Sequence, residues 1–273
     1  MFTQPKIRHP LQDCGTTLRC TNMIVQIYEI QDPWEAERCI ELGVDHIGSV
    51  ILSENAWKNP EIRKVVSLTH QISKSNSLIF LFQNLATIFK ALEYYEPDII
   101  HFCETLVDSK AKPLDISPFL RSQLEVKSRF PEIKVMRSIP IAPPDYRLKP
   151  PSLSLAKQLG EATDIFLTDT WLGEEPIAGF IGITGRPLDW EVAARLVRES
   201  RIPVILAGGL SPDNVYDALI KARPAGADSC TGTNKIDSQG RPIRFRKDFE
   251  KLRLFISEIN RAQKELNSRL IGP

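Results

Sequence analysis

Residues 203–215 read PVILAGGLSPDNV and contain a complete strand–turn–helix signal. The run 203–206 is short, apolar and β-branched, as is typical of a strand buried on both faces. The glycine pair at 208–209 permits a tight turn, and Ser211-Pro212-Asp213 is a helix-start signal. Apolar residues then follow at the spacing of one helical face: Val215, Ala218, Leu219 and Ala222. This stretch therefore predicts one β/α unit.

Similar strand signals recur along the chain, roughly thirty residues apart, which is the length of one β/α unit. Eight runs qualify as strands: 24–27, 46–51, 78–82, 98–102, 133–136, 164–167, 203–206 and 227–230. Eight such units predict a single-domain TIM (β/α)₈ barrel over residues 23–273. A doubly wound open sheet is the alternative, but it requires a glycine-rich turn after the first strand, where the chain has Tyr28-Glu29-Ile30-Gln31.

Helix signals and two additional segments complete the expected organisation. Helices are expected to begin near Asp32-Pro33 and Asp189-Trp190, and a long closing helix is expected over Phe245–Leu266. Residues 1–22 form an N-terminal extension that either packs over the bottom of the barrel or stays mobile. The proline-rich loop 140–151 is either a lid over the site or a stiff surface connection.

The composition excludes several classes of protein. The chain has 273 residues, and Lys+Arg 35 against Asp+Glu 34 leave a net charge of +1, so we expect neither nucleic-acid nor membrane partners. No apolar run is long enough to span a bilayer, and residues 1–10 lack a secretory apolar core. The odd number of cysteines, five with no CxxC pair, fits a reducing compartment. We therefore expect a cytoplasmic protein, either a monomer or a homodimer.

Glycine-rich segments follow three of the late strands, where a barrel places its site. They are 182–185 (GITG), 207–212 (AGGLSP) and 230–233 (CTGT). Glycines let main-chain amides approach an anion, although tight turns need glycine as well. The pattern predicts a phosphate site for a phosphorylated small molecule, most simply a sugar phosphate. The expected phosphate- or substrate-binding residues are Thr184, Gly185, Gly208, Gly209, Asp228, Cys230, Thr231 and Gly232.

These same segments resemble the phosphoribosylanthranilate isomerase family of tryptophan biosynthesis. Residues 206–215 (LAGGLSPDNV) resemble the family's LAGGLTPENV, and 223–232 (RPAGADSCTG) resemble RPYGVDVSSG. The segment 182–185 with Asp189-Trp190 resembles GGTG…FDW, 167–170 (LTDT) resembles LLDT, and 41–48 (ELGVDHIG) resembles ELGADAIG. The resemblance covers about residues 23–262 and implies a barrel enzyme, an intramolecular oxidoreductase-type isomerase.

The family reaction is an Amadori rearrangement of a ribosylamine phosphate, in which a carboxylic acid protonates the ring oxygen and a cysteine thiolate removes a proton from the adjacent carbon. Asp169 matches the acid, unless it caps the following loop. Tyr28 stands where the resemblance places the cysteine, and a phenol is a poor base at neutral pH. Strand alternation places His101 and Cys103 on one face of the fourth strand, and the family register would point them into the barrel mouth. Cys103 is then a candidate relocated thiolate, His101 or Glu104 a candidate general base and Tyr28 a candidate donor, unless these side chains belong to an inert core.

The arginine that the family places after the second strand is absent, and Lys58 is the candidate to replace it.

Other chemistries are less well supported by the residues. A Schiff-base aldolase needs a lysine inside the barrel, and a zinc hydrolase needs clustered ligands, which the four histidines do not provide. We expect neither a metal nor a cofactor. The remaining alternatives are a non-catalytic barrel that senses or scaffolds through a phosphate ligand, and a lyase or synthase acting on another phosphorylated small molecule.

Overall fold

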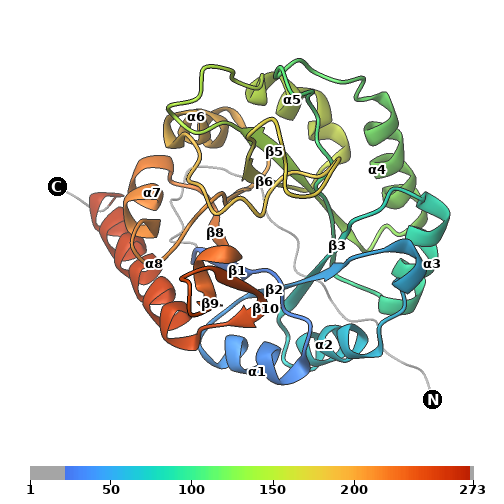
Figure 1. The fold of residues 1–273 in the computed structure, drawn as a ribbon, viewed down its shortest axis with the longest axis horizontal. Coiled ribbons are helices and arrows are strands. Elements are labelled where there is room, and N and C mark those ends of the chain that lie inside the picture. Colours follow the sequence, from blue (N-terminus) through green and yellow to red (C-terminus); the bar gives the residue numbers. More distant parts are fainter. Residues whose placement is uncertain (1–21, 271–273) are drawn as a thin grey trace.

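Strand β1 (Ile24–Ile27) pairs in parallel with both β2 (His46–Ile51) and β8 (Gly226–Ser229), and this double pairing closes the sheet. The computed structural model describes residues 22–270. Its eight parallel strands form a closed barrel in sequence order, ringed by helices (Figure 1). The remaining strands are β3 (Ser75–Phe80), β4 (Ile99–Phe102), β5 (Lys134–Ile141), β6 (Ile165–Thr170) and β7 (Val204–Leu206). The predicted (β/α)₈ barrel is confirmed.

Helices alternate with the strands, and those predicted near Asp32-Pro33 and Asp189-Trp190 begin as expected. They are α1 (Pro33–Glu41), α2 (Pro60–Gln71), α3 (Leu85–Tyr95), α4 (Ser117–Arg129), α5 (Ser152–Leu159), α6 (Trp190–Glu199), α7 (Val215–Ala222) and α8 (Phe249–Leu270). The Asp32 side chain accepts a hydrogen bond from the Glu35 amide at 3.0 Å, and Asp189 accepts one from Glu191 at 3.0 Å. These aspartates satisfy amides that the first turn of a helix leaves without partners.

Two apolar layers hold the barrel together. The inner layer fills the barrel itself and includes Tyr28, Met136, Leu167 and Ile205. The outer layer lies between the strands and the helices, where alternate strand residues meet the apolar helix faces. No helix within residues 22–270 has the length and apolar character needed to cross a membrane.

Several of the predicted strand boundaries were wrong, among them one end of β3 and one end of β5. Strand β3 begins at Ser75, earlier than predicted, because the polar Ser75, Asn76 and Ser77 carry no apolar signal. Strand β5 extends through Pro140 to Ile141, so the proline-rich connection begins later than position 140. All but Asn22 of the predicted N-terminal extension lies outside the described residues.

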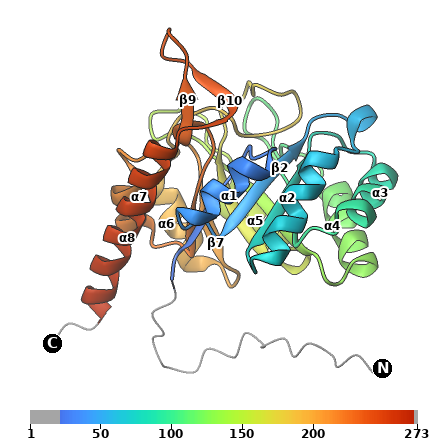
Figure 2. The same cartoon turned by 90° about the horizontal axis from the view of Figure 1, so that it is seen from below.

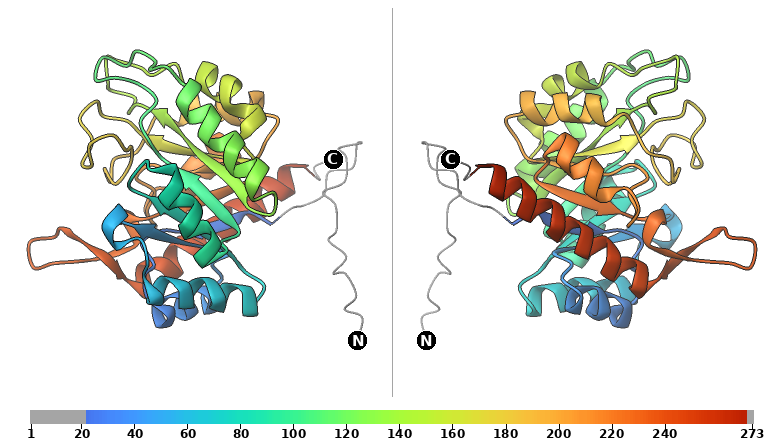
Figure 3. Two further views of the ribbon diagram at one scale, coloured as in Figure 1. Left: turned by 90° about the vertical axis from the view of Figure 1, so that its right-hand side faces the viewer. Right: turned by 90° about the vertical axis from the view of Figure 1, so that its left-hand side faces the viewer.

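The predicted closing helix over Phe245–Leu266 was wrong at its start. Residues 234–247 instead form an antiparallel hairpin of β9 (Asn234–Ile236) and β10 (Pro242–Lys247), and α8 begins only at Phe249. A turn at 237–240 joins the two strands, and the Gly240 amide donates to the Asp237 carbonyl at 3.0 Å. The hairpin projects beyond the end of the barrel that carries the β/α loops (Figures 2 and 3).

Buried charges anchor the base of this hairpin to the barrel. Arg244 forms an ion pair with Glu29, at the end of β1, with an Nε–Oε1 distance of 2.6 Å. Lys247 is buried and its Nζ donates to Asn234 Oδ1 at 2.5 Å and to the Cys230 carbonyl at 2.9 Å. Phe245 lies between these two anchors, within β10, and has a positive φ of 58°, so a helix does not start there.

Candidate active site

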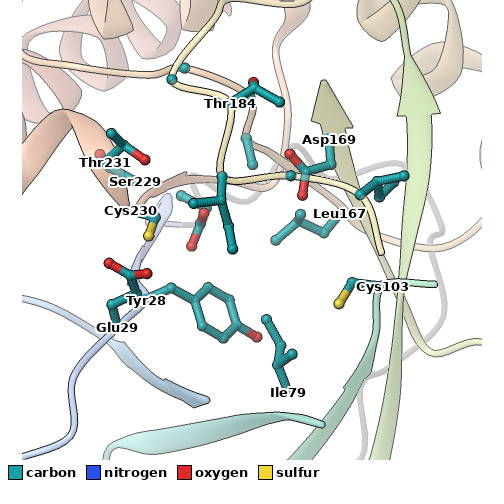
Figure 4. Close-up of a pocket in the computed structure, with 18 of the residues that line it drawn as sticks. Tyr28, Glu29, Ile79, Cys103, Leu167, Asp169, Thr184, Ser229, Cys230 and Thr231 are labelled. Carbon is teal, nitrogen blue, oxygen red and sulfur yellow. The ribbon is translucent and has the colours of Figure 1, made fainter. Parts of the chain in front are cut away.

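A pocket of about 800 Å³, counted to its open mouth, lies at the carboxyl end of the barrel strands (Figure 4). One wall consists of the loops that follow β6, β7 and β8, and the opposite wall is apolar and includes Val50, Ile79 and Leu81. Twelve of the residues expected in the site from the sequence line this pocket: Tyr28, His101, Cys103, Asp169, Thr184, Gly185, Gly208, Gly209, Asp228, Cys230, Thr231 and Gly232. The structure thus brings the expected residues together, and their roles stay predictions.

The glycine loops pack so closely that side chains are excluded at several positions. Gly208 and Gly209 have φ values of 88° and 64°, in the left-handed region that favours glycine. A Cβ at Gly209 would overlap the main chain at Arg186 and Pro187, and one at Gly232 would overlap the Leu210 carbonyl. The loops after β6, β7 and β8 therefore form one continuous wall.

Main-chain amides on this wall are available to an anion. Those of Gly185, Gly208, Gly209 and Gly232 donate to no acceptor within the part of the chain that the structure describes. Arg244 and Lys251 lie on the outer side of the same loops, where the β9–β10 hairpin and α8 border them. The arrangement combines several free N–H groups with nearby positive charge, as phosphate sites of this fold do.

Asp169 reaches the pocket from the end of β6 (Figure 4). Its Oδ1 accepts a hydrogen bond from the Thr170 amide at 2.9 Å, and Oδ2 lies so close to Gly182 that no side chain fits at that position. Burial raises the pKa of Asp169 to about 8, with a further rise from the negative charge of Asp228. A carboxyl in this state is protonated at neutral pH and can act as a general acid.

Asp228 is a buried carboxyl that also lines the pocket, and it lies on β8, beside β1. Gln26 on β1 donates from Nε2 to Asp228 Oδ1 at 3.1 Å. Gln26 Oε1 in turn lies 3.1 Å from His46 Nδ1, so His46 donates there. Burial raises the pKa of Asp228 to about 7, although the hydrogen bond from Gln26 opposes the rise. The pocket therefore contains two carboxyls that both titrate near neutral pH.

Tyr28 crosses the barrel interior instead of remaining above its own strand. Its hydroxyl lies 2.6 Å from Ser77 Oγ on β3 and 2.7 Å from His101 Nδ1 on β4. His101 Nε2 lies 2.8 Å from Ser138 Oγ on β5. Burial raises the pKa of Tyr28 well above its ordinary value and lowers that of His101 to about 3. Both side chains are therefore neutral members of a hydrogen-bonded chain across the barrel.

The other candidate bases are also held in unreactive states. Burial raises the pKa of the Cys103 thiol well above its ordinary value, so it carries little thiolate at neutral pH. Glu104 forms a buried ion pair with Arg137 at 2.6 Å and lies outside the pocket lining. Lys58 lies over the Tyr94 ring, 4.9 Å from its centroid, and likewise lies outside the pocket lining.

The loop between β6 and α6 covers the pocket, which was not predicted from the sequence. Its residues Ile177, Phe180 and Ile181 line the pocket, and Figure 1 shows the loop passing over the barrel mouth. Glu175 fixes the loop by accepting from the Leu172 amide at 2.8 Å. The proline-rich stretch considered as a lid contributes no residue to the pocket lining. The apolar spacing of 177, 180 and 181 was the signal that could have identified this cover.

The fold and the pocket define a (β/α)₈-barrel protein with a ligand site at the carboxyl ends of its strands, the usual location of enzyme sites in this fold. A model of the N-(5'-phosphoribosyl)anthranilate (PRA) isomerase family matches residues 145–258. The chain is therefore similar to this family over its C-terminal part. It is 26% identical to the N-(5'-phosphoribosyl)anthranilate isomerase of Methanosarcina acetivorans over 240 residues, which cover 86% of this chain and 92% of that protein. With the Methanopyrus kandleri enzyme it shares 44% identity over 75 residues, 28% of this chain and 32% of that one.

Solved structures show the same fold. A phosphoribosylanthranilate isomerase from Thermotoga maritima, described as monomers generated from a dimeric protein, superimposes with a TM-score of 0.62 at 18% identity, covering 87% of this chain and 98% of that one. A phosphoribosylanthranilate isomerase in complex with reduced 1-(o-carboxyphenylamino)-1-deoxyribulose 5-phosphate gives the same values. The isomerase from Pyrococcus furiosus gives a TM-score of 0.60 at 20% identity, covering 88% of this chain and all of that one, 100%.

Proposed function

We propose that this protein is a phosphoribosylanthranilate isomerase that rearranges a ribosylamine phosphate to the corresponding 1-amino-2-ketose phosphate. The observation that carries the proposal is the half-buried carboxyl of Asp169, which faces the same pocket as the glycine loops. An Amadori rearrangement begins with protonation of the ring oxygen, and burial keeps a proton on Asp169 at neutral pH. The match to the family model and the complex of a similar protein with a phosphorylated product analogue support this substrate class.

The pocket offers a place for each part of such a substrate. The phosphate fits the amides of the loops at 184–185, 208–209 and 231–232, with Arg244 and Lys251 adding positive charge from outside. The ribose then lies over Asp169 and Asp228. The aromatic ring fits the apolar wall beside Ile79 and Leu81. The rearrangement proceeds by proton transfers and needs no external oxidant or reductant, so no metal or cofactor is included in the proposal.

We further infer that the chain works without the cysteine base of the family. Tyr28 stands at that position, and its hydroxyl is engaged by Ser77 and His101. We place the protein in the cytoplasm, acting on a free phosphorylated metabolite as a monomer or homodimer. This inference leaves the identity of the base as a separate question.

The proposal is tested by complementation and by a direct assay. The full chain, expressed in a tryptophan auxotroph that lacks this isomerase step, is expected to restore growth, and Asp169→Asn is expected to abolish growth. Purified protein should convert phosphoribosylanthranilate, with Asp217→Asn on exposed α7 as the matched Asp-to-Asn control. If the auxotroph does not grow and the purified chain leaves the substrate unchanged, the proposal is wrong.

One observation favours a second candidate, a non-catalytic barrel that binds a phosphorylated ligand. Tyr28, His101 and Cys103 are all held in neutral forms that make poor bases. A sensor or scaffold would retain the glycine loops and lose the base. Binding of the reduced product analogue without any turnover would support this candidate.

A further inference from the structure

We propose that Asp228 is the general base of the rearrangement and takes the place of a strand-one thiolate. This inference rests on the proposed function. Asp228 lies on β8, next to β1, and its register partner is Gln26. Tyr28, two residues further along β1, points away across the barrel toward β3 and β4. Beside the end of β1 the pocket is lined by the carboxylates of Glu29 and Asp228. Both oxygens of Glu29 are engaged, by Arg244 Nε, Asn234 Nδ2 and the Phe245 amide, so Asp228 is the carboxylate with an oxygen available there.

The hydrogen bonds around Asp228 favour its charged form and fix its orientation. Gln26 Nε2 donates to Oδ1 at 3.1 Å, and the amide of Gln26 is itself held by His46 Nδ1 at 3.1 Å. Within residues 22–270, Oδ2 of Asp228 accepts no hydrogen bond and remains available to the pocket. An ionised carboxylate with one oxygen anchored and the other free is suited to removing a proton. Gln26 and His46 are positioning residues in this scheme.

The two pocket carboxyls are electrostatically coupled, and their surroundings differ. Asp228 has the hydrogen bond from Gln26 and the positive charge of Lys247, both of which lower its pKa. Asp169 has only a main-chain donor and feels the negative charge of Asp228, which raises its pKa. The other titratable groups near Asp228 are Tyr28 and Cys230, and both stay neutral. When the pair holds a single proton, that proton is on Asp169 and Asp228 is charged.

Asp169 and Asp228 can carry out every proton transfer of the rearrangement. Asp169 gives its proton to the ribose ring oxygen, the C1–O bond breaks, and the nitrogen lone pair forms an iminium ion at C1. Asp228 removes the proton at C2, the C–H electrons form a C1=C2 bond, and the iminium electrons return to nitrogen. The resulting enolamine becomes the ketone when C1 takes a proton from Asp228 and the enol hydroxyl returns one to Asp169. Both carboxyls end as they began.

The decisive experiment compares Asp228→Asn with the wild type in the full chain. Asparagine keeps the shape and can still accept from Gln26, so the pocket should be preserved. We expect kcat for phosphoribosylanthranilate to fall about 10²–10⁴-fold, the usual range for loss of a general base. The KM and the affinity for the reduced product analogue should change less than about threefold, because phosphate binding is untouched. Thermal unfolding checks that the variant is folded.

Two further measurements separate proton abstraction from a structural role. Asp228→Glu should recover part of the rate, and formate should partly rescue Asp228→Ala. The acid limb of the wild-type kcat/KM profile should disappear in the residual activity of Asp228→Asn, because that limb reports protonation of the base. A folded Asp228→Asn variant with wild-type kcat, or one that changes only KM, would overturn the assignment.

The outcomes also distinguish this inference from the function on which it rests. An inactive wild type removes the proposed function and this inference together. An active wild type whose Asp228→Asn variant remains active removes only the role of Asp228. If Cys103→Ser loses the rate while Asp228→Asn keeps it, the base is the thiol and the inference is wrong.

Discussion

The aromatic ring of Tyr28 occupies the space that a side chain at position 48 would fill, so Gly48 on β2 is what allows Tyr28 to cross the barrel. A Cβ on Gly48 would overlap the ring carbons of Tyr28. The crossing in turn brings the phenol within 2.7 Å of His101 Nδ1. The two positions therefore form a matched pair on adjacent strands.

Gly48→Ala should destabilise the protein by about 1–3 kcal/mol, the usual cost of overpacking a dense interior. The variant Tyr28→Ala should also lose stability, because it leaves a cavity and removes the partner of His101. The double variant should lose less than the sum of the two, since the alanine at 48 then has room. Urea unfolding of all four proteins measures this coupling. Strict additivity would show that the ring and position 48 do not compete for space.

Asp169→Asn should change how stability depends on pH. Burial raises the pKa of Asp169 to about 8. The contribution of this carboxyl to the free energy of unfolding is therefore complete below about pH 4 and is lost as the pH rises through about 8. The variant should therefore gain stability relative to wild type by more than about 1 kcal/mol between pH 5 and pH 9. Denaturant unfolding at the two pH values measures this. A parallel pH dependence in both proteins would contradict burial of an ionisable group at this position, and Asp217→Asn is the control.

Gly209→Ala should weaken phosphate binding more than it affects proton transfer. A Cβ at Gly209 overlaps the main chain at Arg186 and Pro187, so the loops after β6 and β7 must separate. We expect KM for the phosphorylated substrate to rise at least about tenfold, and kcat to fall less than KM rises. Steady-state kinetics with inorganic phosphate as competitor measures both effects. Gly240→Ala, at the exposed hairpin turn with open space around its Cβ, is the glycine-to-alanine control. An unchanged phosphate inhibition constant would place the anion elsewhere.

Arg244→Ala should loosen the hairpin from the barrel. Burial alone would raise the pKa of Glu29, but the charge and hydrogen bond of Arg244, together with Asn234, hold it below its ordinary value. Glu29 therefore stabilises the fold at pH values above its ordinary pKa, and this stabilisation is lost as the pH falls through its lowered pKa. Because Arg244 is partly exposed, we expect a loss of about 1–2 kcal/mol at pH 7. Thermal unfolding should show this loss shrinking at pH 4, whereas a pH-independent loss would exclude the ion pair as its cause.

The sequence predicted the barrel because its signal is repeated. Short apolar runs, glycine turns and capping aspartates recur in the order of β/α units, and each copy supports the others. The glycine loops were predictable as well, since segments such as 207–212 place glycines where the fold puts its ligand site. The pairing of Asp32 and Asp189 with their helices followed from local rules that need no tertiary information.

Features that depend on distant contacts were not predictable. The β9–β10 hairpin replaced a helix because Arg244 and Lys247 find buried partners around Glu29 and Asn234, which a local propensity does not reveal. The direction of Tyr28 likewise depends on Gly48 and on hydrogen-bond partners on β3 and β4. Strand alternation placed Tyr28 inside the barrel, but only the structure shows which wall it faces.

The pairing of β1 with β8 has a consequence for how the protein is made. Gln26 and Asp228 are 202 positions apart in the chain, yet they share a buried hydrogen bond that holds a carboxyl of the pocket lining. Contacts of such large sequence separation slow folding, because a long loop must be ordered before the contact forms. The growing chain on the ribosome thus has no working site until the last strand emerges, and C-terminal truncations that remove β8 are expected to be inactive throughout, with no partially active intermediate lengths.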